Sequence, residues 1–175
     1  MSGYRDNLYL TGFMGSGKSA AARALHALCG MPLLEMDEEI AAEEGMSIPE
    51  IFRVRGEQYF RGLETAFLGR MKERSGTIVS CGGGVPLRPE NVERMRQTGR
   101  IVLLQASPET ILERVIHDNG RPLLADRKTP EGIRTLLEER RPAYEAAASL
   151  VIDTDGKSVQ EVCREIMTEL GLRQA

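Results

Sequence analysis

The feature that most constrains this chain is a glycine-rich segment at residues 12–19, which reads GFMGSGKS. It matches the phosphate-loop pattern G-x-x-x-x-G-K-[ST] and stands between an apolar run, residues 8–10, and an alanine-rich segment with helical periodicity. Glycine accepts the positive φ angles that turn backbone N–H groups toward an anion, and the helix that follows presents the positive end of its dipole there. The pattern therefore predicts a nucleotide-phosphate site at the junction of a strand and a helix.

Each position of this segment has a chemical task that fits a nucleoside triphosphate. Lys18 is expected to reach the β- and γ-phosphates, and the hydroxyl of Ser19 is expected to coordinate Mg²⁺. A glycine-rich turn with a chance lysine is the alternative, but four fixed positions between a strand and a helix favour the nucleotide site. The predicted nucleotide-binding residues of this loop are Gly15, Ser16, Gly17, Lys18, Ser19 and Ala20.

Short apolar runs alternate with helical patterns along the rest of the chain, and such runs are typical of parallel strands buried on both faces. Strands are predicted at residues 8–10, 33–36, 77–80, 100–104 and 150–152. Helices are predicted at residues 18–29, 37–45, 57–72 and 158–170, with others that begin after 47, at 108 and at 130. The alternation predicts a three-layer α/β/α sandwich with a five-stranded parallel sheet and a single domain over residues 1–175. The last helix is expected to bury Val159, Val162, Ile166 and Leu170.

Composition excludes several classes of function. The net charge of −3 offers no general attraction for nucleic acid, and no apolar stretch approaches the length of a membrane span. The first residues carry no apolar signal segment, so we expect a cytoplasmic protein that binds neither nucleic acid nor membrane. Three cysteines without metal or redox spacing are expected to be reduced thiols that pack as small hydrophobic groups.

Residues 117–128 interrupt the regular pattern. The segment is polar, irregular and basic at both ends, and it holds Arg121. An enzyme that transfers a γ-phosphoryl group must exclude water from it, so this segment is interpreted as a lid over the nucleotide, with an ordinary surface loop as the alternative.

Three further features indicate where an acceptor would bind. Asp37 follows the second strand, Gly82–Gly83–Gly84 follows the third, and both lie where open α/β sheets place their ligand contacts. Arg61 stands on an otherwise amphipathic helix. Taken singly, these would be a helix cap, a turn and a surface charge.

Taken together, the motifs of this chain resemble those of the shikimate kinase family. The matching pieces, in order, are GFMGSGKS at 12–19, MDEEI at 36–40, IPEIF at 48–52, GEQYFR at 56–61 with Glu64 after it, CGGGV at 81–85, RPLL at 121–124 and ERRPAY at 139–144. The resemblance implies a P-loop NTPase fold with a lid, a monomer, and the reaction of ATP with shikimate to give ADP and shikimate 3-phosphate. That reaction belongs to chorismate and aromatic amino acid biosynthesis.

The resemblance also implies a role for individual residues. It places shikimate in the region of residues 35–64, with Asp37 as the base that contacts the ring hydroxyls. The remaining substrate contacts that it implies are Arg61 and Arg140 on the carboxylate and the rim Gly82, Gly83 and Gly84. Arg114 would pack against adenine, and Arg121 would join Lys18 at the transferred phosphoryl group. Guanidinium groups suit a planar carboxylate, which gives the two arginines an independent rationale.

Two positions leave the assignment open. The family usually carries Asp-x-Asp where this chain has Glu35-Met36-Asp37, so Glu35 is expected to touch Mg²⁺ only through water. Arg141 stands beside Arg140, and either guanidinium could face the acceptor.

Three alternatives are weighed against this interpretation. A kinase for another small sugar acid, such as gluconate, would share the phosphate loop but should lack GEQYFR and the glycine triplet. Residues 153–156 match the D-x-x-G pattern of GTPases, but they follow the last strand and no N-K-x-D motif exists, so they are interpreted as a turn beside adenine. A catalytically inactive nucleotide-binding module would not need Lys18, Asp37 and Arg121 together.

Overall fold

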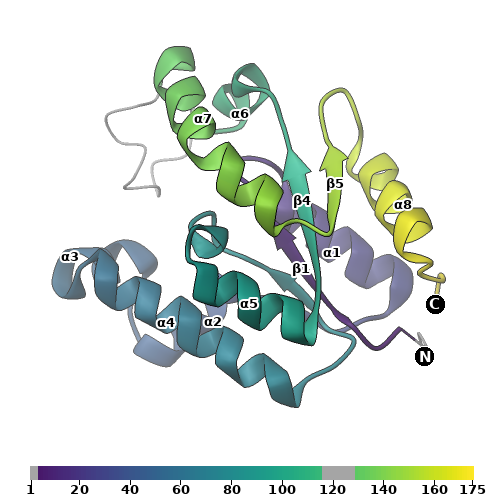
Figure 1. The fold of residues 1–175 in the computed structure, drawn as a ribbon, viewed down its shortest axis with the longest axis horizontal. Coiled ribbons are helices and arrows are strands. Elements are labelled where there is room, and N and C mark those ends of the chain that lie inside the picture. Colours follow the sequence, from purple (N-terminus) through teal and green to yellow (C-terminus); the bar gives the residue numbers. More distant parts are fainter. Residues whose placement is uncertain (1–3, 116–128) are drawn as a thin grey trace.

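Five parallel strands form one sheet in the order β2-β3-β1-β4-β5 (Figure 1). The computed structural model describes residues 4–115 and 129–175. The strands are β1 (Asn7–Thr11), β2 (Leu33–Glu35), β3 (Ile78–Ser80), β4 (Gly99–Gln105) and β5 (Leu150–Asp153). Each was predicted from its apolar run, and the parallel α/β class is confirmed. Because the strands are parallel, the loops after β1, β2 and β3 open at one edge of the sheet.

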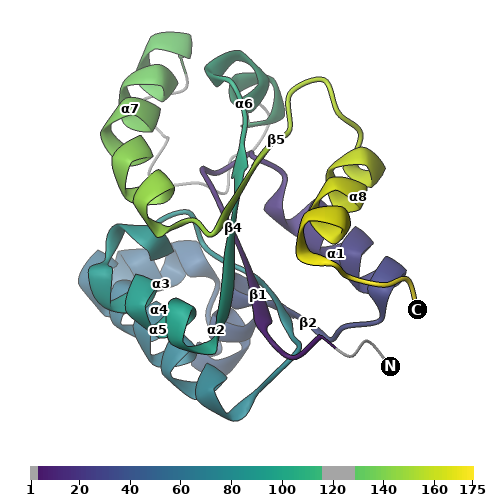
Figure 2. The ribbon, with the colours of Figure 1, turned by 45° about the vertical axis from the view of Figure 1, so that its right-hand side comes forward.

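Helices cover both faces of this sheet. They are α1 (Lys18–Cys29), α2 (Met36–Glu44), α3 (Ile48–Arg55), α4 (Glu57–Arg70), α5 (Pro89–Thr98), α6 (Pro108–Val115), α7 (Pro130–Ala147) and α8 (Val159–Leu170), with 3₁₀ turns η1 (Met71–Glu73) and η2 (Val85–Leu87). Figure 2 shows α1 and α8 together on one side, and α2–α5 and α7 on the other. This is the expected three-layer sandwich.

The alternation of side chains along the strands builds the two layers of core. Leu8 and Leu10 pack with the cluster under α1 and α8, whereas Tyr9 between them packs with the cluster under α2, α4 and α5. Val102 and Leu104 repeat the first pattern on β4. A period of two residues therefore places successive strand residues in opposite cores.

One predicted boundary and one predicted face are wrong, and one helix was not predicted. Met36, predicted as strand, is the first residue of α2, where three carboxylates in the first turn favour a helix start. Helix α5 was not predicted, because its sequence PENVERMRQT offers little apolar periodicity and buries only Asn91 and Met95. On α8, Val159 is exposed at the first turn, while Cys163 and Met167 face the core.

Other predictions from composition concern the cysteines and the membrane. Cys29, Cys81 and Cys163 are buried and unpaired, as expected for small hydrophobic groups. Within residues 4–115 and 129–175, none of the helices combines the length and the apolar character that a bilayer crossing requires. The segment predicted as a lid, residues 117–128 with Arg121, lies outside the described residues.

A pair of glycine substitutions tests the sheet packing. Gly99 pairs with Asn7 across β1 and β4, and a Cβ on Gly99 would overlap the Asn7 carbonyl oxygen and lie 2.7 Å from its carbonyl carbon. We expect Gly99→Ala to lower the free energy of unfolding by about 1–3 kcal/mol through this overpacking. Gly62→Ala, within α4 and facing open space, should raise it by about 0.5–1 kcal/mol. Urea unfolding measures both, and equal stabilities would contradict the packing described here.

Candidate active site

The loop between β1 and α1 has the backbone of an anion cradle. Gly12, Gly15 and Gly17 have φ angles of 145°, 80° and 93°, which residues other than glycine rarely adopt. A Cβ on Gly12 would also overlap the carbonyl oxygen of Leu104 on the adjacent strand. The glycines of the motif therefore allow the turn to form, and Gly12 also allows the loop to pack closely against β4.

The start of α1 is prepared for a negative charge. Gly17 caps it without any side-chain hydrogen bond, and its first turn has no acidic residue. By contrast, Ser47 and Ser158 close the starts of α3 and α8 with complete capping boxes. The first N–H groups of α1 are thus left for an external anion. Lys18 folds over this loop, where its Nζ donates to the carbonyl oxygens of Gly12 at 2.8 Å and Phe13 at 3.0 Å.

A hydroxyl and a carboxylate meet beside the loop. Ser19 Oγ donates to Glu35 Oε2 at 3.0 Å and lies 3.3 Å from Ser80 Oγ. Oε1 of Glu35 is buried, has no hydrogen bond within the described residues, and faces Arg23 Nε at 3.5 Å. Two hard oxygen donors with spare coordination capacity suit Mg²⁺, which takes few protein ligands and completes its shell with water and phosphate. The longer side chain of Glu35 reaches Ser19 directly.

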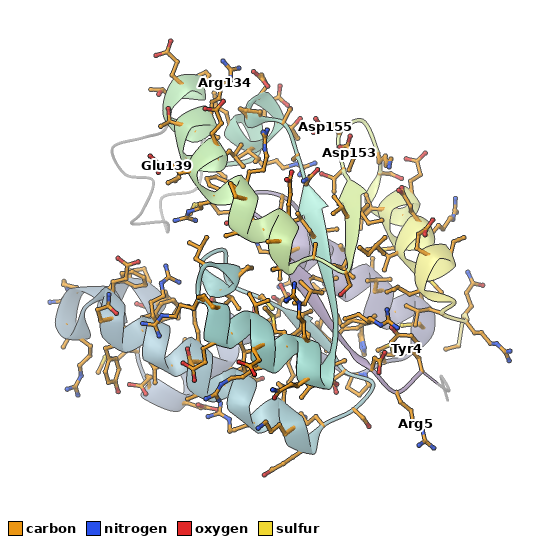
Figure 3. All side chains as sticks on the ribbon, viewed as in Figure 1. Tyr4, Arg5, Arg134, Glu139, Asp153 and Asp155 are labelled. Atoms are coloured by element: carbon orange, nitrogen blue, oxygen red, sulfur yellow. The ribbon has the colours of Figure 1, made fainter. Side chains whose placement is uncertain are left out.

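Arg114 and the loop after β5 flank the other side of the phosphate loop. Arg114 Nη1 donates to the carbonyl oxygen of Gly15 at 2.9 Å. Asp155, labelled in Figure 3 on the loop that follows β5, accepts from the backbone N–H of Ser107 at 3.0 Å. Because Ser107 immediately precedes α6, which carries Arg114, this contact ties the two segments together.

Each glycine of the triplet after β3 approaches a different part of the site. A Cβ on Gly82 would lie 2.7 Å from Glu64 Oε1 and 3.4 Å from Asp37 Oδ1. A Cβ on Gly83 would lie 3.6 Å from the Gly12 carbonyl oxygen, and one on Gly84 would overlap the Arg61 guanidinium. None of the three has a positive φ, so at positions 82 and 84 glycine is needed for close approach and not for an unusual turn.

Arg61 is a buried cation held between two carboxylates. Its Nη1 donates to Glu64 Oε2 at 2.9 Å, and its Nη2 donates to Glu57 Oε1 at 3.2 Å. The Glu64 side chain is fully buried, whereas that of Glu57 is half exposed. Burial raises the pKa of Glu64 to about 7, with the Arg61 charge opposing the rise and the Asp37 carboxylate adding to it.

A second guanidinium reaches the triplet from α7. Arg140 lies over the Phe13 ring, 5.6 Å from its centroid, and its Nη1 is buried without a hydrogen-bond partner among the described residues. That nitrogen would be 3.9 Å from a Cβ on Gly83. One turn later, Tyr144 donates its hydroxyl to the Gly83 carbonyl oxygen at 2.7 Å. Arg141 instead lines a separate pocket, so Arg140 is the arginine of the pair that faces the triplet.

The phosphate loop and the first two glycines of the triplet border one continuous cleft of about 640 Å³. Its lining comes from the phosphate loop, Glu35 and Asp37 after β2, Gly82 and Gly83 after β3, and Arg114. The pocket lined by Arg141 is smaller, about 290 Å³, and also borders Asp153 and Asp155. Of the predicted site residues, Arg121 is the one that lies outside the described part of the chain.

Two residues of this site, Glu64 and Tyr144, were not assigned a role from the sequence. Glu64 appeared there only as part of a motif, and Tyr144 only within ERRPAY. Glu64 stands three residues after Arg61, a spacing that brings two side chains together on a helix. The ion pair between Glu64 and Arg61 could therefore have been predicted from the sequence. Tyr144 reaches Gly83 from a distant helix, and no local pattern signals that contact.

The arrangement can hold a polyphosphate at one end and an anionic, hydroxylated molecule at the other. N–H groups and Lys18 could bind the phosphates, and Arg61 and Arg140 flank a wall of bare backbone. Asp37 lies beside this wall, where a carboxylate could orient or accept the proton of a hydroxyl.

Comparison with known proteins agrees with this geometry. The family model for shikimate kinase matches residues 14–171. A shikimate kinase of Dehalococcoides mccartyi is 39% identical over 166 residues, which cover 95% of this chain and 94% of the relative. One from Geobacter sulfurreducens is 44% identical over 162 residues, 93% of this chain and 89% of the relative.

Solved structures point the same way. Shikimate kinase from Acinetobacter baumannii in complex with shikimate superposes with a TM-score of 0.89 and 34% identity, covering 94% of this chain and 92% of that one. A gluconokinase from Sinorhizobium meliloti shares only the fold, with a TM-score of 0.60 and 24% identity over 95% of this chain and 91% of that one. The family match and the relatives, each aligned over more than nine tenths of the chain, show that it belongs to the shikimate kinase family.

Proposed function

We propose that this chain transfers the γ-phosphoryl group of ATP to the 3-hydroxyl of shikimate, giving ADP and shikimate 3-phosphate. The observation that carries this proposal is one cleft that joins a phosphate loop to a glycine wall beside Asp37. Arg61 lies against Gly84 and Arg140 lies near Gly83, and two guanidinium groups match an acceptor that carries a carboxylate.

At the nucleotide end, the backbone N–H groups of residues 15–20 and Lys18 hold the phosphates, and Arg114 packs against the adenine. Lys18 leaves its carbonyl partners in the loop to balance the charge that develops on the β–γ bridging oxygen. Ser19, with Glu35 through water, would hold Mg²⁺, which neutralises phosphate charge when it is bound. Arg121, in the segment interpreted as a lid, completes this set of cations in the same proposal.

At the acceptor end, Arg61 and Arg140 grip the carboxylate and Gly82–Gly84 form the rim. Asp37 takes the proton of the 3-hydroxyl. The hydroxyl oxygen forms a bond to the γ-phosphorus as the bond between the γ-phosphorus and the β–γ bridging oxygen breaks. Phosphoryl transfer depends chiefly on positioning and charge balance, so this set of residues is sufficient. The same proposal includes a monomer in the cytoplasm, a compartment that suits the three unpaired cysteines.

An acceptor screen tests the function directly. Purified protein with ATP and Mg²⁺ should release ADP with shikimate and not with gluconate or quinate. Lys18→Ala should reduce turnover at least roughly a hundredfold, because the loop loses its cation. A thermal melt serves as the control that this variant is folded. Turnover of gluconate at the rate of shikimate, or full activity of Lys18→Ala, would overturn the proposal.

Substitutions at the two ends of the acceptor site should change different kinetic constants. Arg61→Lys should raise the KM for shikimate at least roughly tenfold with a smaller change in kcat, because an ammonium group cannot form the paired contacts of a guanidinium. Asp37→Asn should lower kcat more than it raises KM, since it keeps an acceptor oxygen but removes the charge that takes the proton. Steady-state kinetics decide this, and the reverse pattern would exchange the two roles.

The pKa of Glu64 predicts proton uptake on binding. Glu64 faces Arg61, Arg88 and Asp37, and the bound carboxylate adds a further negative charge that raises the pKa of Glu64 above its value of about 7. Protein at pH 7 should therefore take up a fraction of a proton, and shikimate affinity should fall as the pH rises through about 7.

Calorimetry in buffers of different ionisation enthalpy measures this uptake. Glu64→Gln should abolish it, and Glu57→Gln is the matched control, because Glu57 contacts the same guanidinium but is half exposed. Uptake that persists in Glu64→Gln would assign the proton to another group.

A further inference from the structure

A buried polar bridge links the helix that carries Arg61 to the turn that follows the glycine triplet. We propose that Thr65 and Asn91 are positioning residues for the acceptor site, which hold the Arg61 guanidinium against Gly84. The inference rests on the proposed function, because it assumes that Arg61 contacts the acceptor. Neither residue lines the cleft that contains the phosphate loop and Asp37.

The bridge consists of short hydrogen bonds between groups that water does not reach. Thr65 Oγ1 donates to Asn91 Oδ1 at 2.7 Å, and Asn91 Nδ2 donates to the carbonyl oxygen of Val85 at 3.0 Å. The Asn91 side chain is fully buried and Thr65 is 9% exposed. The bridge therefore spans three elements, from α4 through α5 to η2.

Both ends of the bridge attach next to the acceptor-binding groups. Thr65 stands one helical turn after Arg61, and its Oγ1 is 3.1 Å from the Arg61 carbonyl oxygen. Val85 directly follows Gly84, whose Cα leaves no room for a Cβ beside the Arg61 guanidinium. The bridge thus sets the distance between α4 and η2 at the point where the Arg61 guanidinium lies against Gly84. A small change in that distance would move the guanidinium relative to Gly84.

Directional bonds explain why polar groups occupy this position. An apolar pair of the same shape would give similar stability, but it would not fix the distance and angle between α4 and η2. Arg88 extends the same network, with Nη1 3.4 Å from Thr65 Oγ1 and Nη2 donating to Gln58 Oε1 at 3.1 Å. Three hydrogen bonds therefore attach α4 to Arg88 and α5, and a fourth attaches α5 to η2.

The chain offers a matched control in Asn7. This asparagine is also fully buried and also bridges separate segments, with Nδ2 donating to the Arg74 carbonyl oxygen at 3.1 Å and Oδ1 accepting from the Thr77 N–H at 3.1 Å. It lies at the start of β1, whereas the acceptor site lies at the opposite, carboxyl end of the sheet. Loss of either bridge should destabilise the fold, but only loss of the Thr65–Asn91 bridge should weaken binding of the acceptor.

Steady-state kinetics of Asn91→Ala and Asn7→Ala, at a temperature where both are folded, test the inference. Asn91→Ala should raise the KM for shikimate roughly tenfold, with the KM for ATP and kcat changed less than about threefold. Asn7→Ala should leave all three constants near those of the wild type. Thr65→Val, which keeps the shape but cuts the bridge, should behave as Asn91→Ala does, and Thr65→Ser should restore the wild-type KM.

A double-mutant cycle separates this inference from the proposed role of Arg61. If the bridge acts through Arg61, Asn91→Ala added to Arg61→Lys should raise the KM for shikimate by much less than it does alone. Wild-type KM in both Asn91→Ala and Thr65→Val, or an equal rise in Asn7→Ala, would overturn the inference. An unchanged KM in Arg61→Lys would instead contradict the proposed function.

Discussion

The parallel pairing of β1 between β3 and β4 is the constraint on which the site depends. The phosphate loop follows β1 and the glycine triplet follows β3, so the two loops leave the sheet side by side. A Cβ on Gly83 would be in van der Waals contact with the carbonyl oxygen of Gly12, at 3.6 Å, so the two loops are neighbours. A donor site and an acceptor site can thus share one cleft without a second domain.

Charge beside the glycine triplet is closely balanced and partly buried. Arg61 and Arg140 oppose Asp37 and Glu64, and the buried Glu64 has a pKa near 7 because water cannot stabilise its charge. In the proposed function, an incoming carboxylate would compete with Glu64 for the same guanidinium. Binding, proton uptake and the orientation of Arg61 would then be coupled through one ion pair.

Buried polar contacts support this arrangement from outside the cleft. Tyr144 fixes the Gly83 carbonyl oxygen, and Asn91 fixes that of Val85, so the middle of the triplet and the residue after it are held by side chains from other elements. The triplet itself has no side chains with which to hold its own shape. Its position is consequently a property of α5 and α7 as much as of β3.

The sequence by itself determined the sheet and the phosphate loop, because strand periodicity and the glycine, lysine and serine of the loop act over a few neighbouring positions. It could not reveal α5, whose inward face is Asn91 and Met95, nor the exposure of Val159. Tertiary structure alone decided that Arg140 and not Arg141 faces Gly83, and that the triplet is glycine because Glu64 and Arg61 occupy the space of a Cβ. Those outcomes depend on contacts between residues far apart in the chain, which no local pattern encodes.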